Sequence, residues 1–449
     1  MNNSAYNLIW ILSDQHRPHA MGCMGDPNAR TPNLDRMAGP CVTGVGGSPL
    51  CSPFRASLLT SQYPHNCVPG HDHALPADSK TVAHAFNDAG YRTSWFGKWH
   101  VDGCENRDEE MRPVFQHVKK ERRGGFDTWV GYENNNAQFD CWVHGHDRSG
   151  DEVDLYKLDG YEIDKLTDLL IDDLNHHDSS EPFFSVLAFQ PPHSPYVAPK
   201  EFLDRYNPNE ITLRPNVPPV GRVVNESRKS LAGYYAMIEN LDWNVGRVLD
   251  TVESMGLADS TYVIYFSDHG DMHGSHGRVL KCVPWEESIR IPFVVSGPNA
   301  REQGGREQRG RSPELINHVD IGPTSLGLCG IDTPDWMVGF DYSGSYVGNG
   351  DAPNTLPDSA YLQLVDPGFE YGFATDRERP WRGIITDDGW KYAVFEGVPW
   401  LMYNLNEDPY EMANLAMDRR FKEQRDRLQG RLRKWITDTR DMFTLPEIR

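Results

Sequence analysis

Hydrophobic residues gather in four short runs along the chain, and polar or ionisable residues follow each run directly. The runs span residues 6–12, 91–96, 183–189 and 262–266. The first is almost continuously apolar, which is typical of a strand buried on both faces of a parallel sheet. The tails that follow are Ser13-Asp14-Gln15, Gly97-Lys98-Trp99-His100, Gln190-Pro191-Pro192-His193 and Ser267-Asp268-His269. Because ligands of open α/β sheets bind beyond the carboxyl ends of the strands, we expect these tails to converge on one site.

Segments with helical spacing of apolar residues lie between these runs. They span residues 79–89, 163–174 and 231–252, and Gly90 and Gly256 supply stop signals beyond the first and the last. Strands that alternate with helices predict an α/β fold, in which a large, mixed but mostly parallel sheet is sandwiched by helices. Residues 102–160 interrupt this alternation and show no clear period, so we interpret them as an insertion of loops.

The carboxyl-terminal part of the chain has a different pattern. Residues 332–359 are dense in proline, glycine, aspartate and serine, so we place a domain boundary there and expect a large domain over residues 1–345 and a small domain over residues 360–449. Two short strands are predicted at residues 381–386 and 390–395, and an amphipathic helix at residues 419–440. The apolar positions expected to dock this helix on the small sheet are Leu428, Leu432, Trp435 and Ile436.

Cys51 stands directly before another predicted helix. Ser52 is a favourable N-cap and Pro53 suits the first helical position, so the amino end of the helix should point at the sulfur. Such an end favours anions. Arg55 follows Cys51 by four residues, which would place its guanidinium on the same helix face and add positive charge beside the sulfur.

The segment Cys51-Ser52-Pro53-Phe54-Arg55, with the Leu-Thr pair that follows, resembles the C-x-P-x-R signature of the type I sulfatases in the alkaline phosphatase superfamily. In that family a formylglycine-generating enzyme oxidises the cysteine to formylglycine after synthesis. The resemblance therefore implies that Cys51 is a precursor rather than a thiol nucleophile. It also implies an alkaline phosphatase-like catalytic domain, closed by a small antiparallel carboxyl-terminal domain.

Oxygen-rich side chains end two of the apolar runs and favour a divalent cation site. Asp14, Gln15, Asp268 and His269 offer carboxylate, amide and imidazole ligands, a set that suits calcium or manganese better than zinc. The segment from Ser267 onward also resembles the metal loop of sulfatases and phosphonate hydrolases. The resemblance implies that the four residues and the modified Cys51 bind one divalent cation, with Ca²⁺ preferred and Mn²⁺ as the alternative. The Gln and His at these positions resemble the branch with choline sulfatases, some sugar sulfatases and phosphonate monoester hydrolases.

Three further segments resemble blocks of the same family. They are Gly97-Lys98-Trp99-His100, Pro192-His193-Ser194-Pro195 and the region around Lys281. The hydrated aldehyde would offer two hydroxyls, one of which attacks the ester after the metal lowers its pKa. Arg55 would hold the hydrate and neighbouring ligands, and Lys98 and Lys281 would balance charge on the ester oxygens. His193, with Lys281, would protonate the leaving alcohol, and His100 would take the proton of the second hydroxyl so that sulfate leaves.

The acidic composition narrows the classes of partner. A formal net charge of -21 over 449 residues argues against nucleic acid or an anionic membrane, so an anionic substrate needs a local cationic pocket. The eight cysteines are scattered without C-x-x-C pairs, which indicates neither a zinc knuckle nor a disulfide framework. The apolar run near the amino terminus is too short for a signal peptide or a membrane span, so we expect a cytoplasmic protein, or a periplasmic one if a leader has been removed.

Three functions stay open on the sequence alone. The first is a sulfatase that acts on a sulfate ester of a sugar or another small alcohol, with a sulfated saccharide as one such substrate. The second is a phosphonate monoester or phosphodiester hydrolase that uses the same site. We favour sulfate because the loops expected around the pocket contain no obvious extra basic cluster. The third is a non-catalytic binding protein of the same fold, and a homo-oligomer is compatible with any of them.

Overall fold

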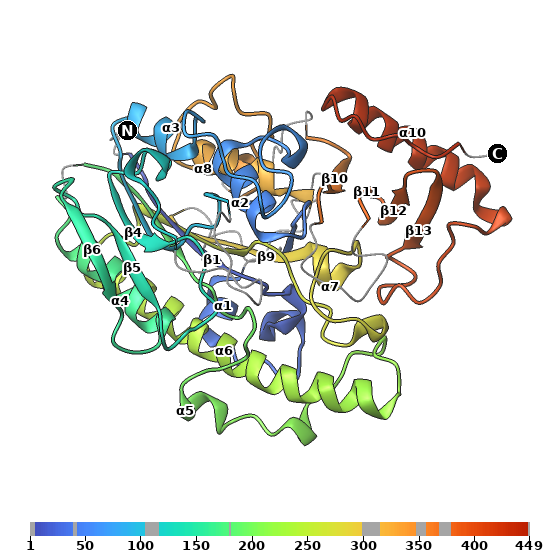
Figure 1. Cartoon of the computed structure of the whole chain (residues 1–449), viewed down its shortest axis with the longest axis horizontal. Coiled ribbons are helices and arrows are strands. Elements are labelled where there is room, and N and C mark those ends of the chain that lie inside the picture. Colours follow the sequence, from blue (N-terminus) through green and yellow to red (C-terminus); the bar gives the residue numbers. More distant parts are fainter. Residues whose placement is uncertain are drawn as a thin grey trace.

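The computed structural model describes residues 5–38, 43–103, 116–178, 181–298, 315–346, 356–367 and 379–447. Its centre is a nine-stranded sheet with the order β2-β9-β8-β1-β7-β3-β4-β5-β6 (Figure 1). The strands are β1 (Asn7–Ser13), β2 (Thr43–Val45), β3 (Arg92–Lys98), β4 (Thr128–Tyr132), β5 (Trp142–His146), β6 (Glu152–Lys157), β7 (Phe183–Ala188), β8 (Thr261–Ser267) and β9 (Arg290–Ser296).

The four apolar runs of the sequence form the adjacent strands β8, β1, β7 and β3 in the middle of this sheet. These strands are parallel to one another, and β4 continues the parallel arrangement beyond β3. Outside this parallel core each successive pair is antiparallel: β8 with β9, β9 with β2, β4 with β5, and β5 with β6. The predicted fold class is therefore confirmed, and the polar tails of four neighbouring strands emerge at one edge of the sheet.

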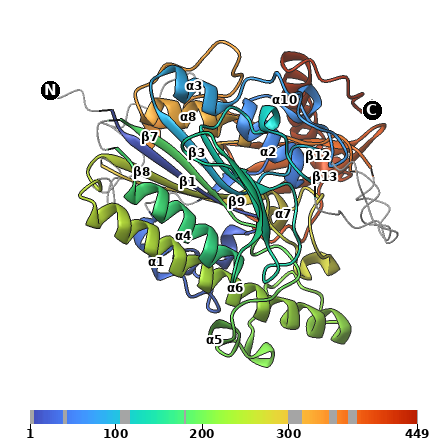
Figure 2. The ribbon, with the colours of Figure 1, turned by 60° about the vertical axis from the view of Figure 1, so that its left-hand side comes forward.

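Helices cover both faces of the sheet, as Figure 2 shows. Along β1, Trp10 packs in a cluster with side chains of α2, α3 and α8, whereas Ile9 and Ile11 pack with α1, α4 and α6 on the opposite face. This alternation explains why the strand is apolar at nearly every position. The helices of the large layers are α1 (Pro32–Met37), α2 (Cys51–Thr60), α3 (Val82–Asp88), α4 (Glu162–Asn175), α6 (Gly221–Ser254) and α8 (Ile321–Leu328); α5 (Lys200–Leu203), α7 (Glu286–Ile289) and α9 (Ser343–Tyr346) are short.

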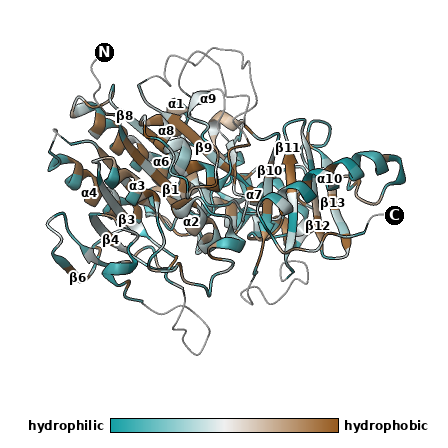
Figure 3. Cartoon of the chain, turned by 90° about the horizontal axis from the view of Figure 1, so that it is seen from above, coloured by the Kyte–Doolittle hydropathy of each residue, from teal (hydrophilic) through white to brown (hydrophobic). Residues whose placement is uncertain are grey.

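A separate four-stranded antiparallel sheet lies towards the carboxyl terminus (Figure 3). It consists of β10 (Ser359–Leu364), β11 (Trp381–Thr386), β12 (Trp390–Phe395) and β13 (Val398–Asn404), and α10 (Lys422–Asp438) packs on it. Leu428, Leu432 and Ile436 are buried against this sheet, and Trp435 packs beside them, as the amphipathic pattern predicts. The division of the chain at residues 346–359 stays a prediction, because residues 347–355 lie outside the described ranges.

Two local predictions are wrong. Residues 102–160 are not only loops, because β4, β5 and β6 lie within them and extend the large sheet. Strand β6 escapes detection because it is an edge strand that buries no side chain fully, so its sequence lacks a core-facing alternation. Ser52 is not an N-cap, because α2 begins at Cys51 with Leu50 in the N-cap position. Within the described ranges, no helix combines the length and apolar character needed to cross a membrane.

A buried lysine connects the small sheet to the large domain. Lys391 on β12 contacts Glu286 at the start of α7, with 2.9 Å between Nζ and Oε1, and also pairs with Glu411. Its side chain is fully buried and compensates the charge of Glu411, whereas Glu286 also pairs with Arg290, with 2.8 Å between Oε2 and Nε. Removing one partner of such a group leaves uncompensated charge in a low dielectric, which is far more destabilising than losing an exposed pair.

We therefore predict that Lys391→Met lowers the free energy of unfolding by about 3–5 kcal/mol, because the buried Glu411 loses its cationic partner, although Glu286 keeps Arg290. Urea denaturation followed by circular dichroism measures the change. The matched control is Lys200→Met, which removes an exposed pair with Asp204 and should change stability by less than about 1 kcal/mol. Equal effects of the two substitutions would contradict a compensating role for Lys391.

Candidate active site

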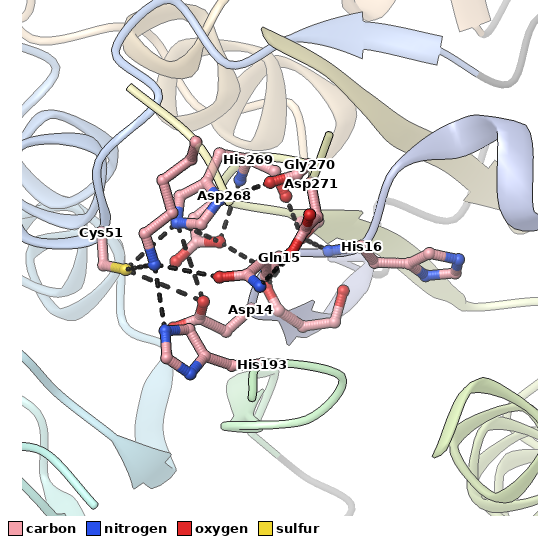
Figure 4. A network of polar contacts seen from close by, with 12 residues as sticks. Asp14, Gln15, His16, Cys51, His193, Asp268, His269, Gly270 and Asp271 are labelled. Atoms are coloured by element: carbon pink, nitrogen blue, oxygen red, sulfur yellow. Dashed lines mark hydrogen bonds and ion pairs between the residues drawn. The ribbon is translucent and has the colours of Figure 1, made fainter. Parts of the chain in front are cut away.

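The predicted site residues meet at the carboxyl ends of the central strands (Figure 4). Asp14 and Gln15 follow β1, Lys98 ends β3, and Asp268 and His269 follow β8. His193 comes after β7, Cys51 begins α2, and Lys281 lies in the loop before α7. All of the residues predicted for catalysis or metal binding, except the half-buried His193, are buried: Asp14, Gln15, Cys51, Arg55, Lys98, His100, Asp268, His269 and Lys281.

Four of these residues form a compact group that could hold a metal ion. One donor atom from each of Asp14, Cys51, Asp268 and His269 lies within 4.8 Å of the others. The His269 Nε2 atom is 3.1 Å from Cys51 Sγ and 3.7 Å from an Oδ1 atom of either aspartate. Carboxylates and an imidazole that point to a common centre fit a divalent cation.

Two cationic side chains, Lys98 and Arg55, lie beside the two aspartates of this group. Lys98 Nζ is 2.5 Å from Asp14 Oδ2, and Arg55 Nε is 3.3 Å from Asp268 Oδ2. Burial and the adjacent Asp14 raise the pKa of Asp268 to about 6. Burial and Cys51 act to raise the pKa of Asp14 as well, but Lys98 and the nearby imidazoles outweigh them and hold it below its usual value. A dication between the two carboxylates would relieve the repulsion that raises the pKa of Asp268.

Gln15 is held in one orientation by a carboxylate that the sequence did not single out. Its Nε2 donates to Asp271 Oδ2 at 2.5 Å, so its Oε1 is left to accept from Lys281 Nζ at 3.0 Å. Asp271 also accepts from the Tyr196 hydroxyl, and its Oδ1 accepts from the backbone N–H groups of His273 and Leu280. All four partners of Asp271 are donors, so the site needs a group that only accepts.

Lys281 and His193 lie within hydrogen-bond distance of each other beside Cys51. Lys281 Nζ lies 3.0 Å from His193 Nε2 and 3.6 Å from Cys51 Sγ. His193 Nδ1 lies 2.7 Å from the carbonyl oxygen of Ser194, which fixes the ring proton on Nδ1 and leaves Nε2 to accept from the ammonium. Burial and Lys281 lower the pKa of His193 to about 4, so the imidazole is neutral near pH 7 and can accept a hydrogen bond from the lysine.

His100 approaches Cys51 together with a second histidine. One donor atom each from Cys51, His71 and His100 lies within 4.8 Å of the others, and the two rings are 4.9 Å apart between centroids. Burial and Lys98 lower the pKa of His100 to about 3, so the ring is neutral and able to accept a proton near pH 7. The His100 backbone has a φ of 59°, a strained value that the surrounding packing maintains.

Cys51 occupies the first position of a ten-residue helix whose residues are all buried. The N–H groups of Cys51 and Ser52 belong to the first turn and have no partner within the helix, whereas Pro53 has no N–H and Phe54 donates to the Leu50 carbonyl oxygen at 3.0 Å. Arg55 lies one turn further along and also donates to the Lys98 carbonyl oxygen at 2.9 Å. The site can thus stabilise negative charge on the side chain of residue 51 and on any group attached to it.

Sequence reasoning identified the residues that end the strands but missed the support around them. Asp271 lies three residues after Asp268, within a segment whose family resemblance was recognised as a whole. Tyr196 follows the block that contains His193. Neither has a local pattern that marks its partner, because Gln15 and Asp271 are brought together only by the pairing of β1 with β8.

Comparisons with known proteins agree with the geometry. The family model described as Sulfatase matches residues 6–331, and a second one, described as N-sulphoglucosamine sulphohydrolase, C-terminal, matches residues 274–438. The ulvan-active sulfatase of Formosa agariphila is 33% identical over 447 residues, which cover 97% of this chain and 82% of that protein.

Solved structures resemble the whole chain. A protein from work on the metabolism of multiple glycosaminoglycans by Bacteroides thetaiotaomicron superposes with a TM-score of 0.83 and 26% identity, covering 98% of this chain and 97% of that one. The phosphonate monoester hydrolase of Agrobacterium radiobacter has a TM-score of 0.73 at 21% identity, covering 97% and 96%. The second likeness concerns the fold alone.

We predict that Asp271→Asn weakens divalent cation binding by about 10- to 100-fold, the range typical for loss of a partner that orients a metal ligand. The new NH₂ group would replace one accepting oxygen and would face donors, either Gln15 Nε2 and the Tyr196 hydroxyl or the backbone N–H groups that Asp271 binds. In the first case the Gln15 amide would lose its fixed orientation. Isothermal titration with Ca²⁺ measures the affinity. Asp204→Asn, at an exposed position, is the control, and unchanged calcium affinity in Asp271→Asn would contradict the positioning role.

Proposed function

The chain belongs to the sulfatase family and is a sulfuric ester hydrolase, and we propose that its substrate is a sulfate ester carried by a saccharide. The observation that carries the proposal is the convergence of a cation site, an anion-stabilising helix end and the Lys281–His193 pair on one side chain, Cys51. Similarity to an ulvan-active sulfatase and to a protein studied in glycosaminoglycan metabolism supports a sulfated saccharide.

Sulfatases generally use a formylglycine and a divalent metal, and the residues present fit both. Cys51 is buried at the helix start beside His100 and Lys281, where an aldehyde hydrate would be surrounded by groups that donate and accept protons. Asp14, Gln15, Asp268 and His269 would hold the cation. We propose Ca²⁺, because three of these four ligands offer oxygen. Together the cation and the modified residue 51 supply an activated oxygen nucleophile near neutral pH.

The remaining residues bind, orient and move protons. Arg55 fixes Asp268 and the end of β3, which keeps the cation ligands and Lys98 in register. Lys98 and Lys281 stabilise negative charge on the ester oxygens as it moves towards the leaving group. Lys281 passes a proton to His193 Nε2, and His193 delivers it to the leaving alcohol oxygen. His100, neutral and close to residue 51, accepts a proton there during release of sulfate.

A phosphonate monoester or phosphodiester is the second candidate substrate. Such an ester also carries one negative charge at the reacting centre. Its leaving group is likewise an alkoxide that needs a proton. The likeness to a phosphonate monoester hydrolase concerns the fold and supports this candidate no better than it supports a sulfate ester. We propose the formylglycine-generating enzyme as the protein partner for either substrate, because both require the modified Cys51.

The test compares aryl sulfate, sulfated monosaccharides and an aryl phosphonate as substrates. The protein is loaded with calcium, and peptide mass spectrometry first verifies the aldehyde at residue 51. We expect preferential hydrolysis of the sulfate esters and its loss in Cys51→Ala, with Cys23→Ala, at an exposed position, as the control. Preference for the phosphonate would mean that the substrate is a phosphonate monoester or phosphodiester and not a sulfate ester. Full activity of Cys51→Ala would refute the mechanism.

We also predict that His193→Ala discriminates between leaving groups. A saccharide alkoxide needs a proton far more than an acidic phenolate does, so hydrolysis of the sugar sulfate should slow by about 10²- to 10⁴-fold while the activated aryl sulfate is affected much less. Measured kcat values for the two substrates give the ratio. His176→Ala, at an exposed position, is the control. An equal loss on both substrates would show that His193 does not act as the acid.

A further inference from the structure

We propose that Cys51, before its conversion, completes a closed zinc site, and that conversion changes the preferred cation of this site from zinc to calcium. The inference rests on the proposed function in one respect, namely that Cys51 is the converted residue. Asp14, Asp268 and His269 would thus bind different cations in the precursor and in the mature enzyme, and the chemical state of residue 51 would decide which cation binds.

The geometry of the precursor suits four-coordinate zinc. Zinc binds sulfur at about 2.3 Å and nitrogen or oxygen at about 2.0–2.2 Å, so the donor atoms of a tetrahedral site lie roughly 3.3–3.8 Å apart. His269 Nε2 lies 3.1 Å from Cys51 Sγ and 3.7 Å from an oxygen of each aspartate. Cys51 Sγ is 3.7 Å from Asp14 Oδ1. These separations need little adjustment to surround one small ion.

The spacing alone accommodates either cation, so the chemistry of the donors decides. A thiolate and an imidazole beside two carboxylates form a mixed sulfur, nitrogen and oxygen set, which selects zinc over calcium. Binding of zinc releases the thiol proton to solvent and adds the negative charge of the thiolate to those of Asp14 and Asp268. After conversion the sulfur is gone and residue 51 offers oxygen, which calcium prefers.

Burial makes the zinc site of the precursor a closed one. Asp14, Asp268 and His269 are fully buried and Cys51 is 1% exposed, and these side chains would fill all four positions around the ion. Structural zinc sites are closed in this way, whereas catalytic zinc sites keep a position for water or substrate. Lys281 would lose its contact with the sulfur but keep those with Gln15 Oε1 and His193 Nε2, both at 3.0 Å.

The consequence is that zinc holds the precursor in an inactive form. The metal would occupy the sulfur, and residue 51 would offer no oxygen nucleophile. Because Cys51 is 1% exposed in the folded chain, the converting enzyme must reach it before folding is complete, so a folded chain that holds zinc is one that escaped conversion. The proposal therefore concerns the order of events, with conversion before calcium loading.

The first experiment uses full-length protein produced without a formylglycine-generating enzyme, with an unmodified Cys51 peptide by mass. It is dialysed against equal concentrations of zinc and calcium, and elemental analysis gives the metal content per chain. We expect one zinc and no calcium for this form, and one calcium without retained zinc for the converted form. An unconverted protein that takes calcium and excludes zinc would overturn the proposal.

Cobalt serves as a spectroscopic probe that does not depend on activity. Bound to the unconverted protein, Co²⁺ should give the near-ultraviolet charge-transfer band of a thiolate–cobalt bond. Cys51→Ser should abolish this band and lower zinc affinity by about 100-fold or more, at least as much as loss of a partner outside the coordination sphere can cost. Cys23→Ser, which removes an exposed thiol, should change neither.

Two outcomes would refute the zinc site. One is a protein that binds zinc but whose cobalt form shows no thiolate–cobalt band, which would mean that Cys51 is not a ligand of the metal. The other is equal zinc affinity of the wild-type and Cys51→Ser proteins. Failure here is separable from failure of the proposed function: the metal content of the unconverted protein is independent of turnover, and sulfate hydrolysis by the calcium-loaded converted protein does not depend on zinc binding by the precursor.

Discussion

Burial of the Asp14 carboxylate at the end of β1 is the constraint on which the rest of the structure depends. β1 lies between β8 and β7 in the middle of the large sheet, where no water reaches the side chain. A charge in that place must be matched by positive groups. The neighbouring elements supply them, because Lys98 ends β3, Arg55 lies on α2, and Asp268 with His269 prepares a place for a dication.

This compensation also creates reactivity. The cationic groups that neutralise Asp14 also lie around residue 51, which is on the same helix as Arg55. Structural charge balance and stabilisation of a reacting anion therefore use the same side chains. Lys281 extends the arrangement, since it contacts a proposed cation ligand, the nucleophile position and the proposed acid at once. The carboxylate of Asp271 accepts from Gln15 Nε2, so the Gln15 amide presents its Oε1 atom to Lys281.

The sequence allowed much of this to be predicted, and the reasons for the remainder are physical. Apolar runs that stop at Asp14, Lys98 and Asp268 predict both the central strands and the edge where they end, because burial on two faces leaves a strong pattern. Strand β6 was missed because an exposed edge strand leaves none. The partnership of Gln15 with Asp271 was missed because it arises from sheet order. Ser52 was wrongly taken as a cap because the helix starts at Cys51, two residues before the predicted first position, Pro53.

A crystal structure of the converted, calcium-loaded protein tests the central claim most directly. The account predicts one cation with ligand distances of about 2.3–2.6 Å to oxygens of Asp14, Asp268 and residue 51, in contact with Gln15 and His269. Lys98 and Arg55 should remain paired with the aspartates. A cation bound elsewhere, or one coordinated without residue 51, would contradict the view that charge compensation at Asp14 and the chemistry at Cys51 are the same arrangement.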